Sequence, residues 1–160
     1  MYTVHKINRL LEQASDLASL EEFDEAFHIY DKILSSDPKN INALIDKGIT
    51  LQRIGKTNQS IKYFDKALKI NPKNIDGLIG KGSALHALGK FSDAISCYDT
   101  ILEINSKFPV ALAYKGLSLG EQGKIKDALK YFKMALVIDK DYDLAQVSKK
   151  KALELLKSKK

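Results

Sequence analysis

The chain has 160 residues, of which 44% are hydrophobic and 29% charged, and its 26 basic against 20 acidic residues give a formal net charge of +6. This balance excludes a disordered polyelectrolyte, and no run approaches the roughly 18 apolar residues that a membrane-spanning helix needs. One cysteine, Cys97, cannot form an internal disulfide or a thiolate metal cluster. The first residues lack the pattern of a secretion signal, so we expect a cytoplasmic protein.

The sequence repeats itself at one fixed interval, and such a period indicates stacked structural units. The dipeptide Lys-Gly returns three times at this interval, and so does Gly-Lys. Aromatic residues keep the same step at Tyr30, Phe64, Tyr98 and Phe132. The period divides most of the chain, without gaps, into four units, which are 7–40, 41–74, 75–108 and 109–142.

Each unit is predicted to contain two antiparallel helices. In the unit 41–74, Leu44 and Leu51 share one helical face, and Phe64 and Ala67 share another further along the chain. The Gly-Lys dipeptide falls between the two faces, where glycine can adopt the left-handed conformation that ends a helix. One such hairpin cannot bury its own apolar face, so neighbouring hairpins must stack.

The ends of the units carry the signals expected between hairpins. Asn40 and Asn74, each preceded by Pro-Lys, fit N-caps of the next helix. Small residues such as Gly48 inside first helices predict a close approach of two helices, since glycine there costs about 1 kcal/mol relative to alanine. Aromatic rings would fill the gap between one hairpin and the next. Beyond residue 142, helical spacing with many lysines predicts a polar-faced capping helix over 143–157.

These residues resemble the tetratricopeptide repeat family, whose unit has a large apolar residue at its fourth place and a small one at its eighth. The fourth place holds Leu10, Leu44, Leu78 and Leu112, and the eighth holds Ala14, Gly48, Gly82 and Gly116. The family's proline near the end of the unit is matched by Pro38 and Pro72 but replaced later by Ser106 and Lys140, and its common tryptophan is absent. The resemblance implies an all-α, right-handed α-solenoid of four helix-turn-helix hairpins plus a C-terminal capping helix, forming a single domain over 1–160.

Motifs that suggest chemistry have simpler structural explanations. Gly55-Lys56-Thr57 imitates the end of a phosphate-binding loop, but that loop needs a glycine five places earlier, where this chain has Thr50. The three histidines are scattered without recurring ligand partners, and Cys97 is expected to be a buried structural thiol. The acidic run that begins at Glu21 is expected to open a second helix, where anions complement the helix dipole. We therefore expect a non-enzymatic protein without cofactor or metal.

The resemblance also implies where a partner would bind, because in this family peptides usually lie along the concave wall built by the first helices. The positions expected to line this groove are Leu11, Ser15, Asn42, Ile45, Ile49, Arg53, Ile79, Ser83, His86, Val110, Tyr114 and Leu117. Exposed aliphatic side chains there would accept an amphipathic helix or an extended apolar peptide. The alternative is that these aliphatic groups pack inside the superhelix and bind nothing.

One subfamily grips the acidic tail of heat-shock chaperones through a clamp of basic and amide side chains on this wall. The corresponding places here include Asp46 and Asp76, which would repel a carboxylate, so we do not expect a chaperone tail as the partner.

Two other functions remain open at this point. The net positive charge could attract nucleic acid, but residues 1–40 hold 4 basic against 8 acidic residues while 41–74 hold 7 against 2, and only two cations are arginine. Nucleic acid is therefore an unfavoured partner, and no membrane partner is expected. The terminal helix could instead pair with a second copy of the chain, which would make the protein a self-associating scaffold in a weak homodimer.

Overall fold

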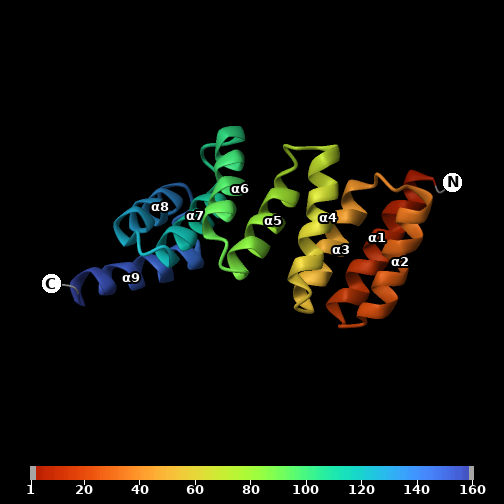
Figure 1. The fold of residues 1–160 in the computed structure, drawn as a ribbon, viewed down its shortest axis with the longest axis horizontal. Coiled ribbons are helices and arrows are strands. Elements are labelled where there is room, and N and C mark those ends of the chain that lie inside the picture. Colours follow the sequence, from red (N-terminus) through yellow and green to blue (C-terminus); the bar gives the residue numbers. More distant parts are fainter. Residues whose placement is uncertain (1–2, 159–160) are drawn as a thin grey trace. The chain divides into compact units, whose positions relative to one another are not determined.

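A computed structural model describes residues 3–158, which form nine α-helices joined by short turns (Figure 1). The helices are α1 (Val4–Ser19), α2 (Phe23–Ser36), α3 (Ile41–Arg53), α4 (Thr57–Ile70), α5 (Ile75–Ala87), α6 (Phe91–Ile104), α7 (Pro109–Glu121), α8 (Ile125–Ile138) and α9 (Asp143–Ser158). The predicted all-helical fold of hairpins followed by a terminal helix is confirmed. No helix among these residues is both long and apolar enough to span a bilayer.

The chain consists of two compact units, 1–84 and 85–160, and the division falls inside α5. Unit 1 contains the α1/α2 and α3/α4 hairpins and most of α5. Unit 2 contains the end of α5, α6, the α7/α8 hairpin and α9.

Glycine ends the first helix of three hairpins, as the sequence predicts. Gly55, Gly89 and Gly123 have positive φ angles of 77°, 73° and 77°. Glu21 stands one repeat before Gly55 and has the same left-handed conformation, with φ at 64°. The acidic run does open α2, which begins at Phe23 with Asp24 and Glu25 in its first turn, but Glu21 itself lies in the turn before the helix.

Both predicted asparagine N-caps are confirmed. The Asn40 side chain accepts a hydrogen bond from the backbone N–H of Ala43 at 3.0 Å, and Asn74 accepts one from Gly77 at 2.8 Å. Each bond satisfies a backbone donor that the first turn of a helix leaves without a partner.

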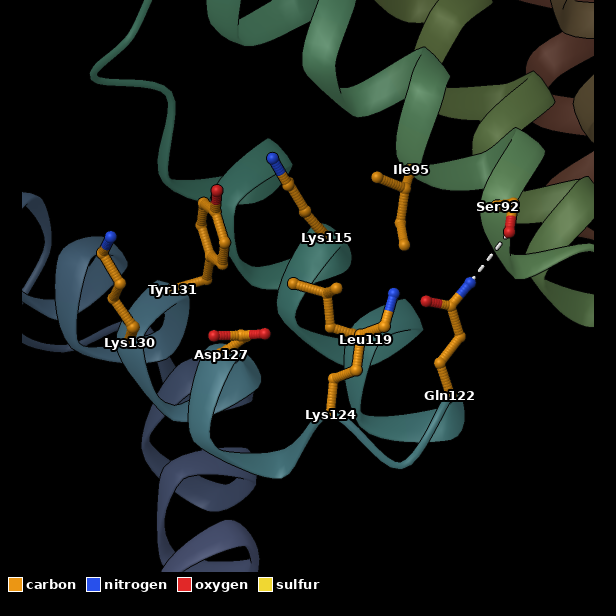
Figure 2. Close-up of a pocket in the computed structure, with 9 residues that line it drawn as sticks. All are labelled: Ser92, Ile95, Lys115, Leu119, Gln122, Lys124, Asp127, Lys130 and Tyr131. Carbon is orange, nitrogen blue, oxygen red and sulfur yellow. Dashed lines mark hydrogen bonds between the residues drawn. The ribbon is translucent and has the colours of Figure 1, made fainter.

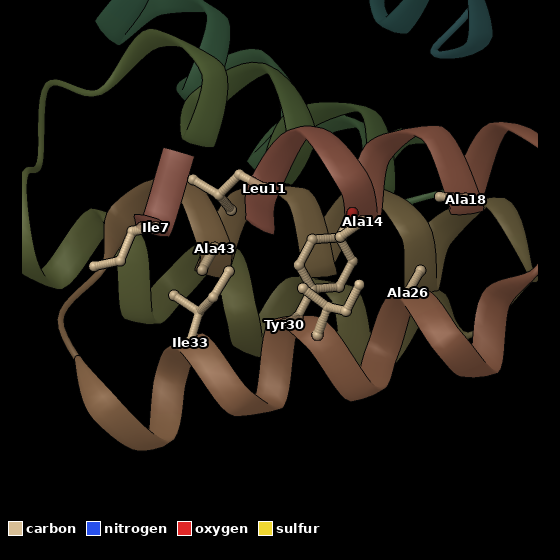
Figure 3. Packing of buried hydrophobic residues seen from close by; sticks show 9 residues of the cluster. Ile7, Leu11, Ala14, Ala18, Ala26, Tyr30, Ile33 and Ala43 are labelled. Atoms are coloured by element: carbon tan, nitrogen blue, oxygen red, sulfur yellow. The ribbon is translucent and has the colours of Figure 1, made fainter. Parts of the chain in front are cut away.

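The core of the first hairpin places a large ring against small residues. Tyr30 and Ile33 on α2 are almost fully buried, and the Tyr30 ring extends toward Ala14 of α1 (Figure 3). Ala43 of α3 belongs to the same cluster, so the first hairpin and the next share one core. Burial of each large side chain contributes about 1.5–3 kcal/mol.

In the second hairpin, the Phe64 ring lies between two glycines. A Cβ atom added to Gly48 of α3 would lie 2.8 Å from the ring, and one added to Gly80 of α5 would lie 2.4 Å from it. Gly116 has the same relation to Phe132, at 2.6 Å. The predicted close approach at Gly48 is confirmed, and the ring fills the gap to the next first helix, as expected.

An ion pair also recurs at each of the three boundaries between repeats, and it was not predicted from the sequence. The lysine of each Lys-Gly dipeptide binds an aspartate on the preceding second helix, as in Lys81–Asp65 at 2.7 Å and Lys115–Asp99 at 2.5 Å. Lys47 and Asp31 form the third pair. Each pair connects one hairpin to the first helix of the next, so these lysines hold the repeats together.

Candidate functional site

Unit 1 presents a row of partly accessible side chains on its first helices, here called the first-helix face of unit 1. It is formed by Ser15 of α1, by Asn42, Asp46 and Ile49 of α3, and by Asp76, Ile79 and Ser83 of α5. These positions recur at helical spacing, so on each helix they share one side.

Two of the aliphatic residues expected on this face are not available to a partner. Leu11 and Ile45 are buried. Leu11 packs in the core of the first hairpin, and Ile45 belongs to the cluster around Phe64. The expectation that they are exposed is wrong, because each side chain packs into the apolar cluster of its own hairpin.

The remaining aliphatic residues of unit 1 are accessible. Ile49 is 43% exposed, and Ile79 is half-buried on the next first helix. Beside them, the Gln52 amide nitrogen donates a hydrogen bond to the Ser83 hydroxyl at 3.0 Å, which connects α3 to α5. The surface around Ile49 and Ile79 is therefore held in place by its own polar contacts.

Arg53, also expected in the groove, is engaged with the first hairpin. Its Nη1 atom donates a hydrogen bond to the Ala18 carbonyl at 2.9 Å, and its guanidinium lies 5.7 Å from the centre of the Phe23 ring. Its role in this structure is to connect the end of α3 to the first hairpin.

The carboxyl group of Asp46 on this face has a perturbed pKa. Burial raises its pKa, and the neighbouring Asp76 raises it further, to about 6. An aspartate has a pKa of about 3.9 in an unfolded chain. At neutral pH the folded protein therefore holds a charge that its surroundings disfavour.

We expect Asp46→Asn to stabilise the protein at pH 7.5 and to have little effect at pH 4. Between about pH 4 and 6 the folded state binds more protons at Asp46 than the unfolded state does, so stability falls as pH rises through this window and stays lower above it. Since part of the carboxyl group is accessible to water, the gain at pH 7.5 should be roughly 1 kcal/mol. Urea unfolding of both proteins at the two pH values measures it, and an equal effect at both would contradict the assignment.

In unit 2, two of the expected groove residues make structural contacts. Nδ1 of His86 lies 2.9 Å from the hydroxyl oxygen of Ser118 in a hydrogen bond, and the imidazole packs edge-on against Phe91 at 5.2 Å. The Tyr114 ring stacks on Tyr98 with centroids 5.7 Å apart. Burial, with a contribution from Tyr114, raises the pKa of Tyr98. Val110 and Leu117 are half-buried.

The protein-family model "Tetratricopeptide repeat" matches residues 51–115. This stretch includes most of the second predicted unit and all of the third. Residues 51–115 are tetratricopeptide repeats. The repeated hairpins, with glycine turns and paired small and aromatic residues, are how this chain builds that architecture.

Solved structures with the same fold include three that are each 22% identical to this chain. A MamA protein has a TM-score of 0.80, with 95% of this chain and 83% of that one covered. A tetratricopeptide repeat protein from Parabacteroides merdae ATCC 43184 has 0.77, with coverage of 90% and 57%. The first repeat domain of Spaghetti (RPAP3), bound to the HSP90 peptide SRMEEVD, has 0.70, with coverage of 75% and 95%. At this identity the likeness concerns the fold. A search of curated proteins gave no significant match.

The repeats of unit 2 also form pockets that were not predicted from the sequence. One, of about 240 Å³, lies where α7, α8 and α9 meet, and Leu117, Phe132 and Leu155 contribute to its apolar lining. Leu117 is the one expected groove residue in it.

Another pocket, of about 400 Å³, is lined from α6, α7 and α8 and contains several ammonium groups (Figure 2). Lys115 is already bound to Asp99, and its ammonium lies 4.4 Å from the centre of the Tyr131 ring. The Gln122 amide nitrogen donates to the Ser92 hydroxyl at 2.9 Å. No expected groove residue lies in this pocket, and a signal for it is not visible in the sequence because its lining comes from three helices.

Within residues 3–158, no three His, Cys, Asp or Glu side chains are placed to hold a metal ion together. Cys97 is buried in α6, as expected for a structural thiol.

Proposed function

We propose that this protein is a non-enzymatic interaction module that binds an amphipathic helix or extended apolar segment of a partner protein. Tetratricopeptide repeat domains are generally protein–protein interaction modules. The observation that carries the proposal here is the exposed Ile49 beside the half-buried Ile79 on adjacent first helices of unit 1.

The accessible pair is a suitable contact surface for physical reasons. Contact with a partner would remove the apolar surface of Ile49 and Ile79 from water, which contributes roughly 25 cal/mol per Å² buried. The face lies on helices that the core and the Gln52–Ser83 hydrogen bond already fix, so little ordering would oppose binding. An amphipathic segment presents apolar side chains at the spacing that two neighbouring helices can contact.

The partner is proposed to differ from the one in the Spaghetti complex. The peptide in that structure, SRMEEVD, ends in a run of carboxylates. Asp46 and Asp76 occupy the corresponding wall here, and like charges at close range oppose binding.

Peptide display provides the experiment. Random 16-residue peptides are selected on the immobilised protein, and fluorescence anisotropy then measures their affinity for Ile49→Ser/Ile79→Ser. Removing both aliphatic groups should weaken binding by about tenfold or more, since burial of one large aliphatic side chain alone contributes more than about 1.4 kcal/mol. Serine is used instead of a charged residue so that the variant removes the apolar contact without changing the net charge of the face.

Ile70→Ser/Ile104→Ser is the matched control. These isoleucines are 40% and 41% exposed, close to Ile49, but lie at the ends of second helices. Peptides that bind both double variants equally well would contradict the proposed face.

A second candidate, self-association through α9, has its own observation. Leu153 stands one repeat after Leu119, yet Leu153 is 38% exposed whereas Leu119 is 8% exposed under α8. Val147 on the same helix is also exposed. In the described residues α9 lacks a following helix that would cover these side chains.

If α9 pairs with a second copy, light scattering should show a mass that rises with concentration above 17.9 kDa, and Leu153→Lys/Val147→Lys should restore the mass of one chain. A mass that stays at one chain across the concentration range would exclude this pairing.

A further inference from the structure

Adjacent first helices of unit 1 carry the same two side chains in the same order. Asp46 is followed three residues later by Ile49 on α3, and Asp76 is followed three residues later by Ile79 on α5. Residues three apart lie on one side of a helix. The face therefore presents two carboxylates next to two aliphatic groups, about one helical turn apart.

The two carboxylates have no cation to balance them within the described residues. The ion pairs there join Lys47, Lys81 and Lys115 to other aspartates. Arg53, the cation expected on this face, donates to the Ala18 carbonyl instead. Asp76 is also close enough to Asp46 to disfavour the ionised form of the Asp46 carboxyl group.

The later repeats lack this combination. The places that correspond to Asp46 and Asp76 one repeat later hold Gly80 and Val110, and those after that hold Tyr114 and Leu144. The repeat framework consequently does not require an acid at either place. Acids that the fold does not need, on an accessible surface, are suited to a role in recognition.

We propose that the first-helix face of unit 1 binds a helical segment that carries a Lys or Arg one turn away from a large aliphatic residue. The cation lies between Asp46 and Asp76, and the aliphatic side chain contacts Ile49 and Ile79. This inference rests on the proposed function and adds the charge of the partner to it.

The arrangement explains why the protein retains an unfavourable charge. A bound ammonium or guanidinium group would stabilise both carboxylates as anions, so the cost present in the free protein is relieved in the complex. Replacing Asp46 by Asn should then stabilise the free protein but weaken the complex, a combination typical of binding sites.

The test uses the same random 16-residue peptide library displayed against the wild-type protein. Selected peptides should contain Lys or Arg within four residues of Leu, Ile, Met or Phe. Asp46→Asn/Asp76→Asn should weaken these peptides at least tenfold, and exchanging the peptide's cation for Gln should weaken them similarly. Combining the protein variant with the peptide exchange should weaken binding little more than either change alone, because both remove the same interaction.

Glu103→Gln/Glu154→Gln is the control, since it removes the same net charge at exposed positions on α6 and α9 and should leave affinity unchanged. Selected peptides without basic residues, or full affinity for the Asp46→Asn/Asp76→Asn variant, would overturn the inference. If such peptides still fail to bind Ile49→Ser/Ile79→Ser, the proposed function stands and only the cation is refuted. A library that yields no binding peptide would overturn both.

Discussion

Gly80→Ala is expected to destabilise unit 1 by about 1–3 kcal/mol, although alanine is a better helix former than glycine by about 1 kcal/mol. The added Cβ would lie 2.4 Å from one Phe64 ring carbon and 2.5 Å from another, far inside van der Waals contact. The ring is fully buried and cannot retreat, because Gly48 faces it from the other side. Urea unfolding followed by circular dichroism measures the loss.

Gly120→Ala is the matched control for this prediction. Gly120 also lies inside a first helix, but the nearest atom to its added Cβ is the Cβ of Ala128 at 3.8 Å, an ordinary contact. Alanine there should stabilise the protein by up to about 1 kcal/mol. Phe64→Leu should lessen the cost of Gly80→Ala, because the shorter side chain vacates the overlap. If both glycine variants gain stability, the close packing of Phe64 is contradicted.

The architecture was predictable because the repeat multiplies weak local signals. A single Gly55-Lys56 is ambiguous, but three copies at one interval identify the turn between helices. Glu21 occupies the same place in the first repeat and carries no glycine signal, so only the register of the repeats could have identified it as a turn residue. Gly80 was harder to interpret, since its partner, Phe64, belongs to the previous repeat.

The candidate site was predictable only in part, because exposure depends on neighbouring hairpins. Helical spacing placed Ile45 and Ile49 on similar sides of α3, yet Ile45 is buried and Ile49 is not. A family-based register names the side of the helix that faces the wall, but it does not say how far each side chain reaches into the next hairpin. The hydrogen bond that Arg53 donates to the Ala18 carbonyl likewise depends on contact between hairpins.

Asp31→Asn is expected to cost about 2 kcal/mol of stability, Asp99→Asn about 1 kcal/mol, and Asp65→Asn less. Each removes the partner of one repeated lysine, and those lysines differ in burial: the side chains of Lys47, Lys115 and Lys81 are 9%, 15% and 30% exposed. An ammonium group left without its counter-charge costs more the less water can reach it. Urea unfolding of the three variants measures the order.

Two further measurements separate loss of the ion pair from a general effect of the substitution. Burial lowers the pKa of Lys47, but hydrogen bonds to Asp31 and Tyr63 outweigh it and leave the pKa raised. The pair therefore contributes fully below the unfolded lysine pKa of about 10.4, so the cost of Asp31→Asn should be constant from pH 7 to 9 and shrink at higher pH. Lys47→Met combined with Asp31→Asn should recover much of the loss, because no buried charge then remains. Equal costs for Asp31→Asn and Asp65→Asn would show that burial of the lysine does not set the strength of this repeated contact.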